Sequence, residues 1–365
     1  MEIIHVILGK NNVRWQYDIN RMVYLIANEQ KRTGQKVKVW NVTRNKSHNY
    51  SASKFPTRFF QSALLPFQLT KELKLAVLEH PSAVFHLHGA WSPLFFQLSK
   101  VFDANQIRFV MTPHGQYAPA LIEKAMLPRW LYFRFIERHM LERAHKIHAD
   151  RRDDFDGLQA MYPNAKSFLL NFGFKPRVGL KSKGKNVNFT LGYIGNLDVV
   201  EPHMYVLFHA FERFQRVYRE SEFWIVGDGR ARKTIERYLQ QRGFQHVKLL
   251  GKKYGEEKDA ALSSMHALLY ASDGMDVALP VLEAAAHGVP AIVSSSSNIQ
   301  LDVLQYNAGY CVELENVEAW VSAMAQVYHT YHRSSNEVYR SGTIQLLNEG
   351  YSWTKLLPKY KSLYS

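Results

Sequence analysis

Short apolar runs typical of buried strands alternate with amphipathic helical stretches, and they do so in two successive series. The strand-like runs of the first half are Ile3–Leu8, Val37–Val42, Val84–His88 and Phe109–Thr112. Those of the second half are Phe189–Ile194, Phe223–Val226, Val247–Leu250, Ala267–Tyr270 and Ala291–Ser294, with helical stretches at Tyr205–Tyr218, Arg232–Arg242 and Leu279–His287. Helices between successive strands make those strands parallel. The sequence therefore predicts an α/β protein with a doubly wound parallel sheet in each half.

The length of the chain allows two domains. Its 365 residues are enough for two hydrophobic cores, and 46% hydrophobic with 21% charged residues is the composition of a folded protein. Between the two series, Lys175–Asn188 is polar and contains Gly and Pro, which indicates a connecting segment. We expect an N-terminal domain over 1–177, a linker over 178–188, a C-terminal domain over 189–350 and a final helix within 351–365.

The residue types exclude several kinds of site. Cys311 is the single cysteine, so an intramolecular disulfide or a multi-thiolate metal site cannot form, and a reducing cytoplasm fits. The sixteen histidines include no cluster in the sequence that completes a ligand set, and we expect no bound metal and no cofactor. The N-terminal sequence lacks the basic start of a signal peptide, and there is no run of about 18 apolar residues for a membrane span. We therefore expect a cytoplasmic protein.

Residues 275–294 (Met-Asp-Val-Ala-Leu-Pro-Val-Leu-Glu-Ala-Ala-Ala-His-Gly-Val-Pro-Ala-Ile-Val-Ser) carry the most specific pattern. They predict a loop, a helix that begins near Leu279 and carries Glu283, and a turn with Gly288 and Pro290 that leads into a buried strand. Amides in the first helical turn, around Leu279 to Leu282, can bind a phosphate at the positive end of the helix dipole. A carboxylate one turn further can accept hydrogen bonds from a ribose diol. The segment therefore predicts a nucleotide site.

Two His-Gly pairs, His88-Gly89 and His114-Gly115, follow predicted strands of the first half. Ligands of open α/β sheets bind at the carboxyl ends of strands, and a glycine there lets the backbone approach a ligand closely. In the second half, glycine-containing loops follow strands within Leu191–Pro202, Trp224–Arg230 and Val247–Tyr254.

Together these segments resemble the retaining glycosyltransferases of the group-1 (family 4) clan, and the resemblance covers nearly the whole chain. It implies a GT-B fold, in which two Rossmann-like domains face each other across a cleft and a final helix crosses back to the N-terminal domain. It also implies metal-independent transfer of a sugar, with retention, from a nucleotide diphosphate sugar to a glycan. A lipid-linked acceptor, as in surface-polysaccharide assembly, is the narrower expectation.

The resemblance also assigns roles to residues. Glu283 is expected to bind the nucleotide, and His114 to reach the donor sugar and its diphosphate. His88, Gly89 and Gly115 are expected on the acceptor side.

Three positions depart from the pattern of the clan. Asn196 and Glu201 stand where an Arg and a Lys normally neutralise the donor diphosphate, and Met275 stands where the first of two motif glutamates is expected. Basic groups that could substitute are Arg230, Lys252 and Lys253, and either Asp273 or Asp276 could replace the missing carboxylate. The alternative is a catalytically inactive GT-B module that binds a glycan or a partner transferase.

The positive charge lies almost entirely in the first half. Residues 1–177 hold 26 Lys and Arg against 13 Asp and Glu, whereas residues 178–365 hold 20 against 19. A predicted helical stretch, Pro119–His148, mixes basic residues (Lys124, Arg129, Arg134, Arg138, Arg143, Lys146) with aromatic and apolar ones (Trp130, Leu131, Tyr132, Phe133, Phe135, Ile136). Such a helix can bind an anionic membrane surface at the inner face of the cell membrane, or its aromatic residues can pack in the core. No base-reading module is recognisable, and no nucleic-acid partner is expected.

Overall fold

The chain forms two compact units in a computed structural model that describes residues 1–9, 14–44, 55–119, 126–176, 184–274, 278–334 and 337–365. One unit consists of Met1–Gly173 together with Trp353–Ser365, and the other of Phe174–Ser352. Of the expected linker, residues 178–183 lie outside the described residues, and residues 184–188 belong to the second unit. Among the described residues, no helix combines the length and the apolar character that crossing a bilayer requires.

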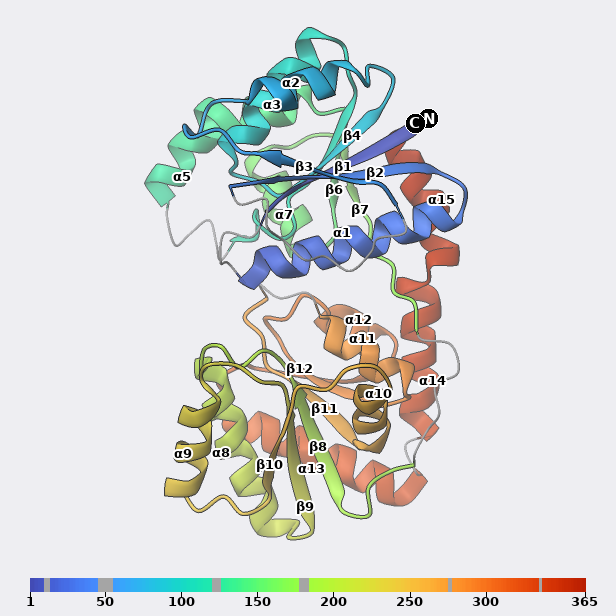
Figure 1. Ribbon diagram of the computed structural model, residues 1–365. Helices are drawn as coiled ribbons and strands as arrows, with labels where there is room; N and C mark the ends of the chain where they lie inside the picture. Colours follow the sequence, from blue (N-terminus) through green and yellow to red (C-terminus); the bar gives the residue numbers. More distant parts are fainter. Residues whose placement is uncertain (10–13, 45–54, 120–125, 177–183, 275–277, 335–336) are drawn as a thin grey trace. The chain divides into compact units, whose positions relative to one another are not determined.

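The first unit contains seven parallel strands in the order β3-β2-β1-β4-β5-β6-β7 (Figure 1). The strands are β1 (Glu2–Leu8), β2 (Lys36–Thr43), β3 (Thr57–Gln61), β4 (Val84–His88), β5 (Phe109–Thr112), β6 (Lys146–Ala149) and β7 (Ser167–Leu169). The helices are α1 (Arg14–Arg32), α2 (Lys71–Leu78), α3 (Pro93–Ala104), α5 (Met126–Tyr132), α6 (Arg138–Arg143), α7 (Arg152–Met161) and α15 (Trp353–Tyr364), and a π-helical segment, η1 (Phe133–Glu137), joins α5 to α6.

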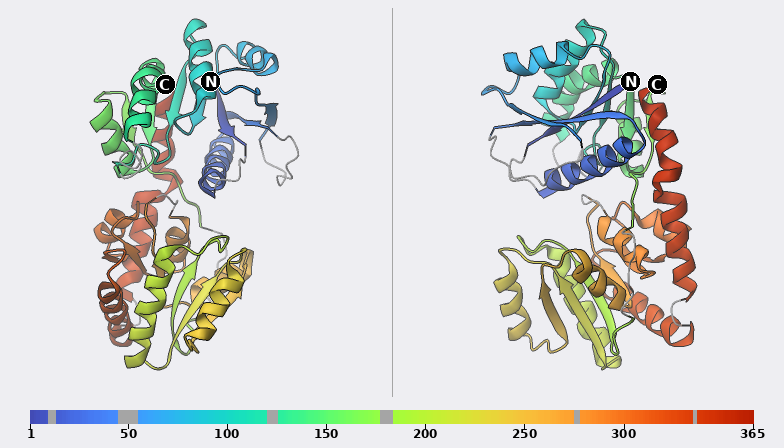
Figure 2. Two further views of the ribbon diagram at one scale, coloured as in Figure 1. Left: turned by 90° about the vertical axis from the view of Figure 1, so that its left-hand side faces the viewer. Right: turned by 45° about the vertical axis from the view of Figure 1, so that its right-hand side comes forward.

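Both faces of this sheet are covered by helices (Figure 2). Because side chains alternate along a strand, Ile4 and Val6 of β1 pack toward α2 and α3, while Ile3 and Ile7 pack toward α1 and α15. The C-terminal helix α15 thus completes the core of the first unit, with Tyr360 fully buried.

The second unit contains six parallel strands in the order β10-β9-β8-β11-β12-β13. The strands are β8 (Phe189–Ile194), β9 (Ser221–Val226), β10 (Val247–Gly251), β11 (Ala267–Tyr270), β12 (Ala291–Ser294) and β13 (Gly309–Val312). The helices are α8 (Pro202–Val217), α9 (Arg232–Gln241), α10 (Gly255–Ser264), α11 (Leu279–Ala286), α12 (Gln300–Gln305), α13 (Val317–Ser334) and α14 (Glu337–Gln345), followed by a π-helical segment η2 (Leu346–Tyr351).

Each strand-like run that the sequence indicated is a strand, but the prediction for Pro119–His148 was wrong at its end. The helix stops at Arg143, and Lys146–Ala149 is strand β6 between β5 and β7. Ile147 is fully buried there, and a four-residue buried run next to a long helix gives no periodic signal of its own.

Candidate functional site

The second sheet reverses its strand order between β8 and β11, since β9 and β10 lie on one side of β8 and β12 and β13 lie beyond β11. In open α/β sheets, ligands bind beyond the carboxyl ends of the strands at such a switch point. The loops at this edge are the segments that follow β8, β9, β10 and β11. We call them the donor edge.

The loops after β8 and β9 interlock. Leu197 donates its N–H to the carbonyl of Asp228 at 3.2 Å, and Ala231 donates to the carbonyl of Leu197 at 2.8 Å. A Cβ at Gly229 would lie 2.2 Å from the carbonyl carbon of Leu197, and one at Gly227 would lie 1.9 Å from a backbone oxygen in the β8 loop. The Gly-x-Gly pattern is therefore required by close packing of these two loops.

Asn196 and Arg230 lie in these loops, and both bind Asp198. The Asn196 side-chain amide donates to the Asp198 carboxylate at 2.9 Å, and the Arg230 backbone N–H donates to its other oxygen at 3.3 Å. These two hydrogen bonds, together with the positive charges of Arg230 and Lys252, lower the pKa of Asp198. Arg230 and Lys252 are exposed, and Lys253 pairs with Glu257 at 3.4 Å. The candidate cations are thus at the donor edge, but a carboxylate lies among them.

Glu283 lies on α11, one turn into the helix, and forms an ion pair with Lys258 of α10 at 2.5 Å. The two side chains are 18% and 20% exposed, so the pair is partly shielded from water. The Leu279 and Leu282 side chains are buried in the core, and the N–H of Leu282 donates to the carbonyl of Ala278. Because Pro280 has no N–H, the amide of Leu279 is the candidate anion donor of this turn.

Of the remaining residues expected at the donor edge, some are described by the structure and others are not. Asp273 is exposed in the loop after β11, next to Gly274, whose φ of 89° and close approach to the Ser296 carbonyl require glycine. Asp276 and Met275 lie outside the described residues. Glu201 is the N-cap residue of α8 and does not cap the helix with its side chain.

In the first unit, His88 and His114 are brought together at the carboxyl ends of β4 and β5. His114 Nε2 lies 2.9 Å from His88 Nδ1, and its Nδ1 lies 2.6 Å from the Asp150 carboxylate. The side chains of Asp150 and His114 are each 3% exposed, and both ring nitrogens of His114 form hydrogen bonds inside the protein. His114 and Gly115 have φ of 56° and 79°, a left-handed turn that is uncommon for histidine. Gly89 also has a positive φ, of 126°.

The loops that carry these pairs are held by buried carboxyl groups that the sequence did not indicate. Glu137, in η1, accepts the backbone N–H of Trp91 at 3.0 Å and the hydroxyl of Tyr117 at 2.6 Å. Asp154, in α7, accepts the N–H of Tyr117 at 2.8 Å. Burial raises the pKa of Glu137 and of Asp154 to about 7. Detecting these residues from the sequence would have required knowing that η1 and α7 pack behind the two His-Gly loops.

A cavity of about 170 Å³ opens at the carboxyl edge of the first sheet, where the order reverses between β1 and β4. Its lining combines apolar and polar side chains from the ends of three strands, a loop and the start of α3, including Leu8, Thr43, Ser62, Leu65 and Ser92. This cavity could not be predicted from the sequence, because segments far apart in the chain form it.

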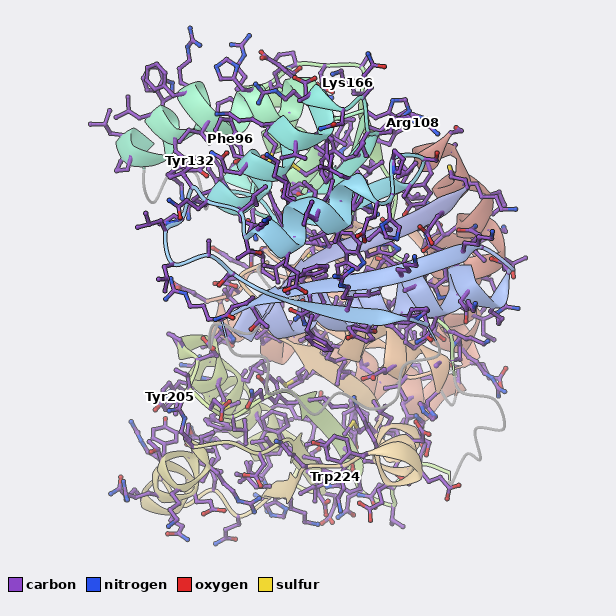
Figure 3. All side chains as sticks on the ribbon, turned by 45° about the horizontal axis from the view of Figure 1, so that its top comes forward. Phe96, Arg108, Tyr132, Lys166, Tyr205 and Trp224 are labelled. Atoms are coloured by element: carbon purple, nitrogen blue, oxygen red, sulfur yellow. The ribbon has the colours of Figure 1, made fainter. Side chains whose placement is uncertain are left out.

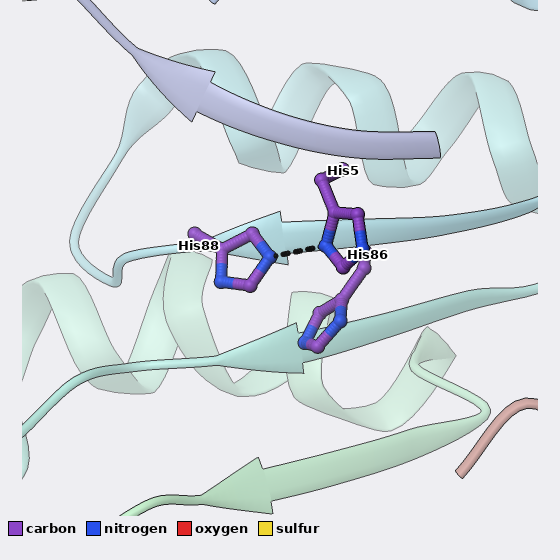
Figure 4. Close-up of side chains that lie close together, drawn as sticks. All are labelled: His5, His86 and His88. Atoms are coloured by element: carbon purple, nitrogen blue, oxygen red, sulfur yellow. Dashed lines mark hydrogen bonds between the residues drawn. The ribbon is translucent and has the colours of Figure 1, made fainter. Parts of the chain in front are cut away.

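Three histidines meet at the centre of the same sheet, His5 from β1 and His86 and His88 from β4 (Figure 4). One nitrogen of each lies within 4.8 Å of the others, which is close enough for a shared metal ion. Each ring, however, already has both nitrogens in hydrogen bonds to protein groups. A metal would therefore have to displace several of these bonds.

Comparisons with known proteins agree with this architecture. Residues 19–166 match the model of "Glycosyltransferase Family 4", and residues 188–330 match that of "Glycosyl transferases group 1". No curated protein gives a significant sequence match.

Several solved structures superpose over the whole chain. TarM from S. aureus, solved with fondaparinux, alpha-GlcNAc-glycerol and UDP, is 10% identical with a TM-score of 0.75, covering 100% of both chains. HepE from Anabaena in complex with UDP is 12% identical with a TM-score of 0.74, covering 100% of this chain and 99% of that one. The lipopolysaccharide outer core galactosyltransferase WaaB is 13% identical with a TM-score of 0.72, covering 100% and 99%. With one family model on each unit and this fold throughout, the chain belongs to the group 1 (family 4) glycosyltransferases and has their GT-B fold.

Proposed function

We propose that this glycosyltransferase moves a sugar from a nucleotide diphosphate sugar to a glycan, without a metal and with retention of the anomeric configuration. The observation that carries the proposal is the donor edge, where Glu283, the amide of Leu279 and the cations Arg230 and Lys252 lie at the switch point of the second sheet. These groups match a nucleotide diphosphate: a carboxylate for the ribose, and an amide and cations for the phosphates.

Uridine diphosphate sugars are the first donors to test. The structures of TarM and HepE named above were solved with UDP.

The departing diphosphate can take the proton of the acceptor hydroxyl, so the reaction needs positive groups around the diphosphate more than it needs a side-chain base. Asp273 is the described candidate for the missing motif carboxylate, and Asp276 remains a second one.

The cavity at the edge of the first sheet supports an acceptor site in the N-terminal unit. It offers the hydroxyls of Thr43 and Ser62 together with the apolar side chains of Leu8 and Leu65. Sugars bind to surfaces of this mixed kind, since their ring faces are apolar and their hydroxyls need partners. His88 and Gly89 lie at the end of the neighbouring strand β4, and we propose that this loop contributes to the acceptor side.

A lipid-linked acceptor is supported by the surface of α5 and η1. Leu127, Trp130 and Phe135 are 68%, 57% and 64% exposed there, and Arg134 is exposed beside them. Exposed aromatic residues next to basic ones suit the interface of an anionic membrane. We therefore propose a peripheral position at the cytoplasmic face of the membrane, where a glycan carried on a lipid would be presented.

A panel of nucleotide sugars tests the donor assignment. The melting temperature should rise with one class among UDP-, GDP-, ADP- and dTDP-sugars, since a ligand at 100 times its dissociation constant stabilises the native state by about 2.7 kcal/mol. The product of that donor should keep the anomeric configuration in proton NMR, and EDTA should leave the rate unchanged. Loss of activity in EDTA would overturn metal independence, and an inverted product would overturn retention.

A further inference from the structure

Trp91, in the loop after β4, has a backbone conformation that is rare for a bulky residue. Its φ is 57°, in the left-handed region that glycine occupies more easily. A conformation of this kind persists only where the surrounding structure enforces it, and such residues gather at functional sites. The contacts of Trp91 therefore show what holds this turn in place.

Two hydrogen bonds hold Trp91. Its backbone N–H donates to Glu137 Oε1 at 3.0 Å, and its indole N–H donates to the backbone carbonyl of Gln116 at 3.0 Å. The ring also packs against the rings of Tyr117 and Phe133, with centroid distances of 5.4 and 6.2 Å. Because the bond to Glu137 is made by the main chain, this carboxyl group acts directly on the backbone of the turn.

Glu137 lies at the end of the π-helical segment η1. A π-helical turn contains more residues than an α-helical turn, which changes the face on which the following side chains lie, and such turns are frequent at functional sites. Within this stretch, Trp130 and Phe135 are largely exposed, whereas Glu137 is fully buried. The segment thus directs one carboxyl group inward to the loop after β4.

The carboxyl group of Glu137 is not placed for stability alone. Oε1 accepts the N–H of Trp91 and the hydroxyl of Tyr117, the latter at 2.6 Å. Oε2 is buried and has no hydrogen-bond partner among the residues that the structure describes. A buried polar atom without a partner is unfavourable, and it calls for an explanation beyond the fold.

The residues that directly follow Trp91 form part of the wall of the cavity at the edge of the first sheet. Ser92, Pro93 and Leu94 line this cavity. Ser92 is also the N-cap residue of α3, where its hydroxyl accepts the N–H of Phe95 at 3.4 Å. The direction in which the chain leaves Trp91 therefore determines where this wall and the start of α3 lie.

We propose that Glu137 is a positioning residue for the acceptor, because by holding the Trp91 turn it places the cavity wall formed by Ser92, Pro93 and Leu94. This inference rests on the acceptor site proposed above. A hydroxyl beside two apolar side chains suits a sugar, whose ring face is apolar and whose hydroxyls need partners. Glu137 itself does not touch the acceptor, and all of these residues belong to the first unit.

Three variants of the full-length chain test this role by steady-state kinetics. Glu137→Gln keeps an oxygen that can accept both hydrogen bonds, so KM for the acceptor should stay near wild type. Glu137→Leu leaves the buried N–H of Trp91 without its acceptor, and KM for the acceptor should rise by roughly 10- to 100-fold. Tyr117→Phe is the matched control, since it removes the other bond of the same carboxyl group and should keep the wild-type KM.

In all three variants, KM for the donor and kcat at saturating acceptor should stay near wild type, because lost binding of one substrate raises its KM without lowering kcat. A residue that served the fold alone would lower the melting temperature and leave the ratio of the two KM values unchanged. If Glu137→Leu does not fold, Glu137→Asp replaces it, because the shorter side chain should also lose contact with Trp91 and raise KM for the acceptor.

Hydrogen exchange of the Trp91 indole N–H measures the turn without reference to activity. It can be followed by NMR with labelled tryptophan, and Trp91→Phe assigns the signal. Exchange should be faster than in wild type in Glu137→Leu, and unchanged in Glu137→Gln and Tyr117→Phe.

Two results would overturn the positioning role alone. In the first, the indole of Glu137→Leu exchanges at the wild-type rate, so that the turn does not depend on Glu137. In the second, exchange becomes faster but KM for the acceptor does not change, so that the wall does not bind the acceptor. If the wild type transfers a sugar to no acceptor, the proposed function fails and this role fails with it, while the exchange rates still show whether Glu137 holds the turn.

Discussion

At the scale of single residues, the ion pair between Lys258 and Glu283 is the contact that bears most directly on the proposed nucleotide site. They lie on the adjacent helices α10 and α11, and their ion pair fixes the direction of a carboxylate that is only partly exposed to water. A carboxylate held in this way is preorganised to accept the hydroxyls of a ribose, because little side-chain entropy is lost on binding.

Glu283→Gln should weaken nucleotide binding by about 10- to 100-fold, since a hydrogen bond to a charged group contributes about 1.5–3 kcal/mol. The melting temperature should stay near wild type, because the side chain at this position is partly exposed and the glutamine amide oxygen can still accept a hydrogen bond from Lys258. Calorimetric titration with the preferred nucleotide measures the effect, with the exposed Glu315→Gln as the matched control. Equal affinity in the Glu283 variant and the control would remove this residue from the nucleotide site.

Arg230→Ala should lower kcat by roughly 10²-fold, the scale for losing one preorganised group that stabilises developing charge. The melting temperature should stay near wild type, because the Arg230 side chain is exposed and it is the backbone N–H of this residue that donates to Asp198. Steady-state kinetics of sugar transfer give the answer, and Arg237→Ala on the exposed side of α9 is the matched control. If the Arg230 variant keeps the full rate, Lys252 becomes the next cation to replace.

The sequence led to Glu283 and Arg230 because each follows a strand in a local pattern. It did not lead to Lys258, Asp150 or Glu137, since the partners of these groups lie on other elements. Nothing within a short window of sequence distinguishes a buried carboxyl group from an exposed one. Such pairs become visible only when the packing of the helices behind the loops is known.

At the scale of elements, the surface of α5 and η1 differs from an ordinary helix face. Tyr132, labelled in Figure 3, ends α5 and is partly buried beside Trp91 at a ring distance of 6.0 Å. Phe133 is buried in the core, whereas Trp130 and Phe135 are largely exposed. Some aromatic residues of this stretch therefore pack in the core, while others leave an exposed surface for which membrane binding stays a prediction.

The double variant Trp130→Ser/Phe135→Ser should bind vesicles of 30% anionic lipid at least about 10-fold more weakly, because burial of an aromatic side chain contributes about 1.5–3 kcal/mol. Binding of the wild type should also fall as salt screens the charge on Arg134. Vesicle sedimentation measures both effects, and Val217→Ser on α8, another exposed apolar position, is the control. Equal binding of wild type to anionic and zwitterionic vesicles at low salt would exclude the electrostatic part.

The buried face of the first sheet should make stability depend on pH. Burial lowers the pKa of His5 and His148 to about 4, and that of His86 and His88 also lies below the ordinary value of 6.5. Between pH 6.5 and 4 the unfolded chain binds protons on these rings and the native chain does not, so stability is lost as the pH falls. Asp154 and Glu137, with pKa raised to about 7, act in the opposite sense but are fewer.

Urea unfolding should therefore show a lower free energy of unfolding at pH 5 than at pH 6.5. His148→Gln, which removes a titrating ring but can keep bonds to Thr112 and Leu170, should reduce this pH dependence. If the free energy of unfolding is the same at pH 5 and at pH 6.5, these histidines do not stay neutral in the native protein at pH 5.

The parallel sheets were predictable because their strands are short apolar runs, but the polar stripe on the first sheet was also present in the sequence. His5, His86, His88, Thr112 and His148 occupy the same face of their strands by simple alternation. What the sequence could not give was register, because only the pairing of β1 with β4 places His5 opposite His86.

At the scale of the whole molecule, the chain has the two-unit GT-B fold. The donor edge belongs to the second unit, and the buried histidines of the first sheet belong to the first unit. The final helix α15 belongs to the first unit, although the residues before it belong to the second. The chain therefore passes between the units twice.

The most direct test of this account is transfer of a sugar by the purified full-length chain from a stabilising nucleotide sugar to a lipid-linked glycan, followed by mass spectrometry and NMR of the product. We expect one added sugar per acceptor with retained anomeric configuration, an undiminished rate in EDTA, and a large loss of activity in Glu283→Gln. Tight nucleotide binding without transfer to any acceptor or to water would contradict the account and support an inactive GT-B module.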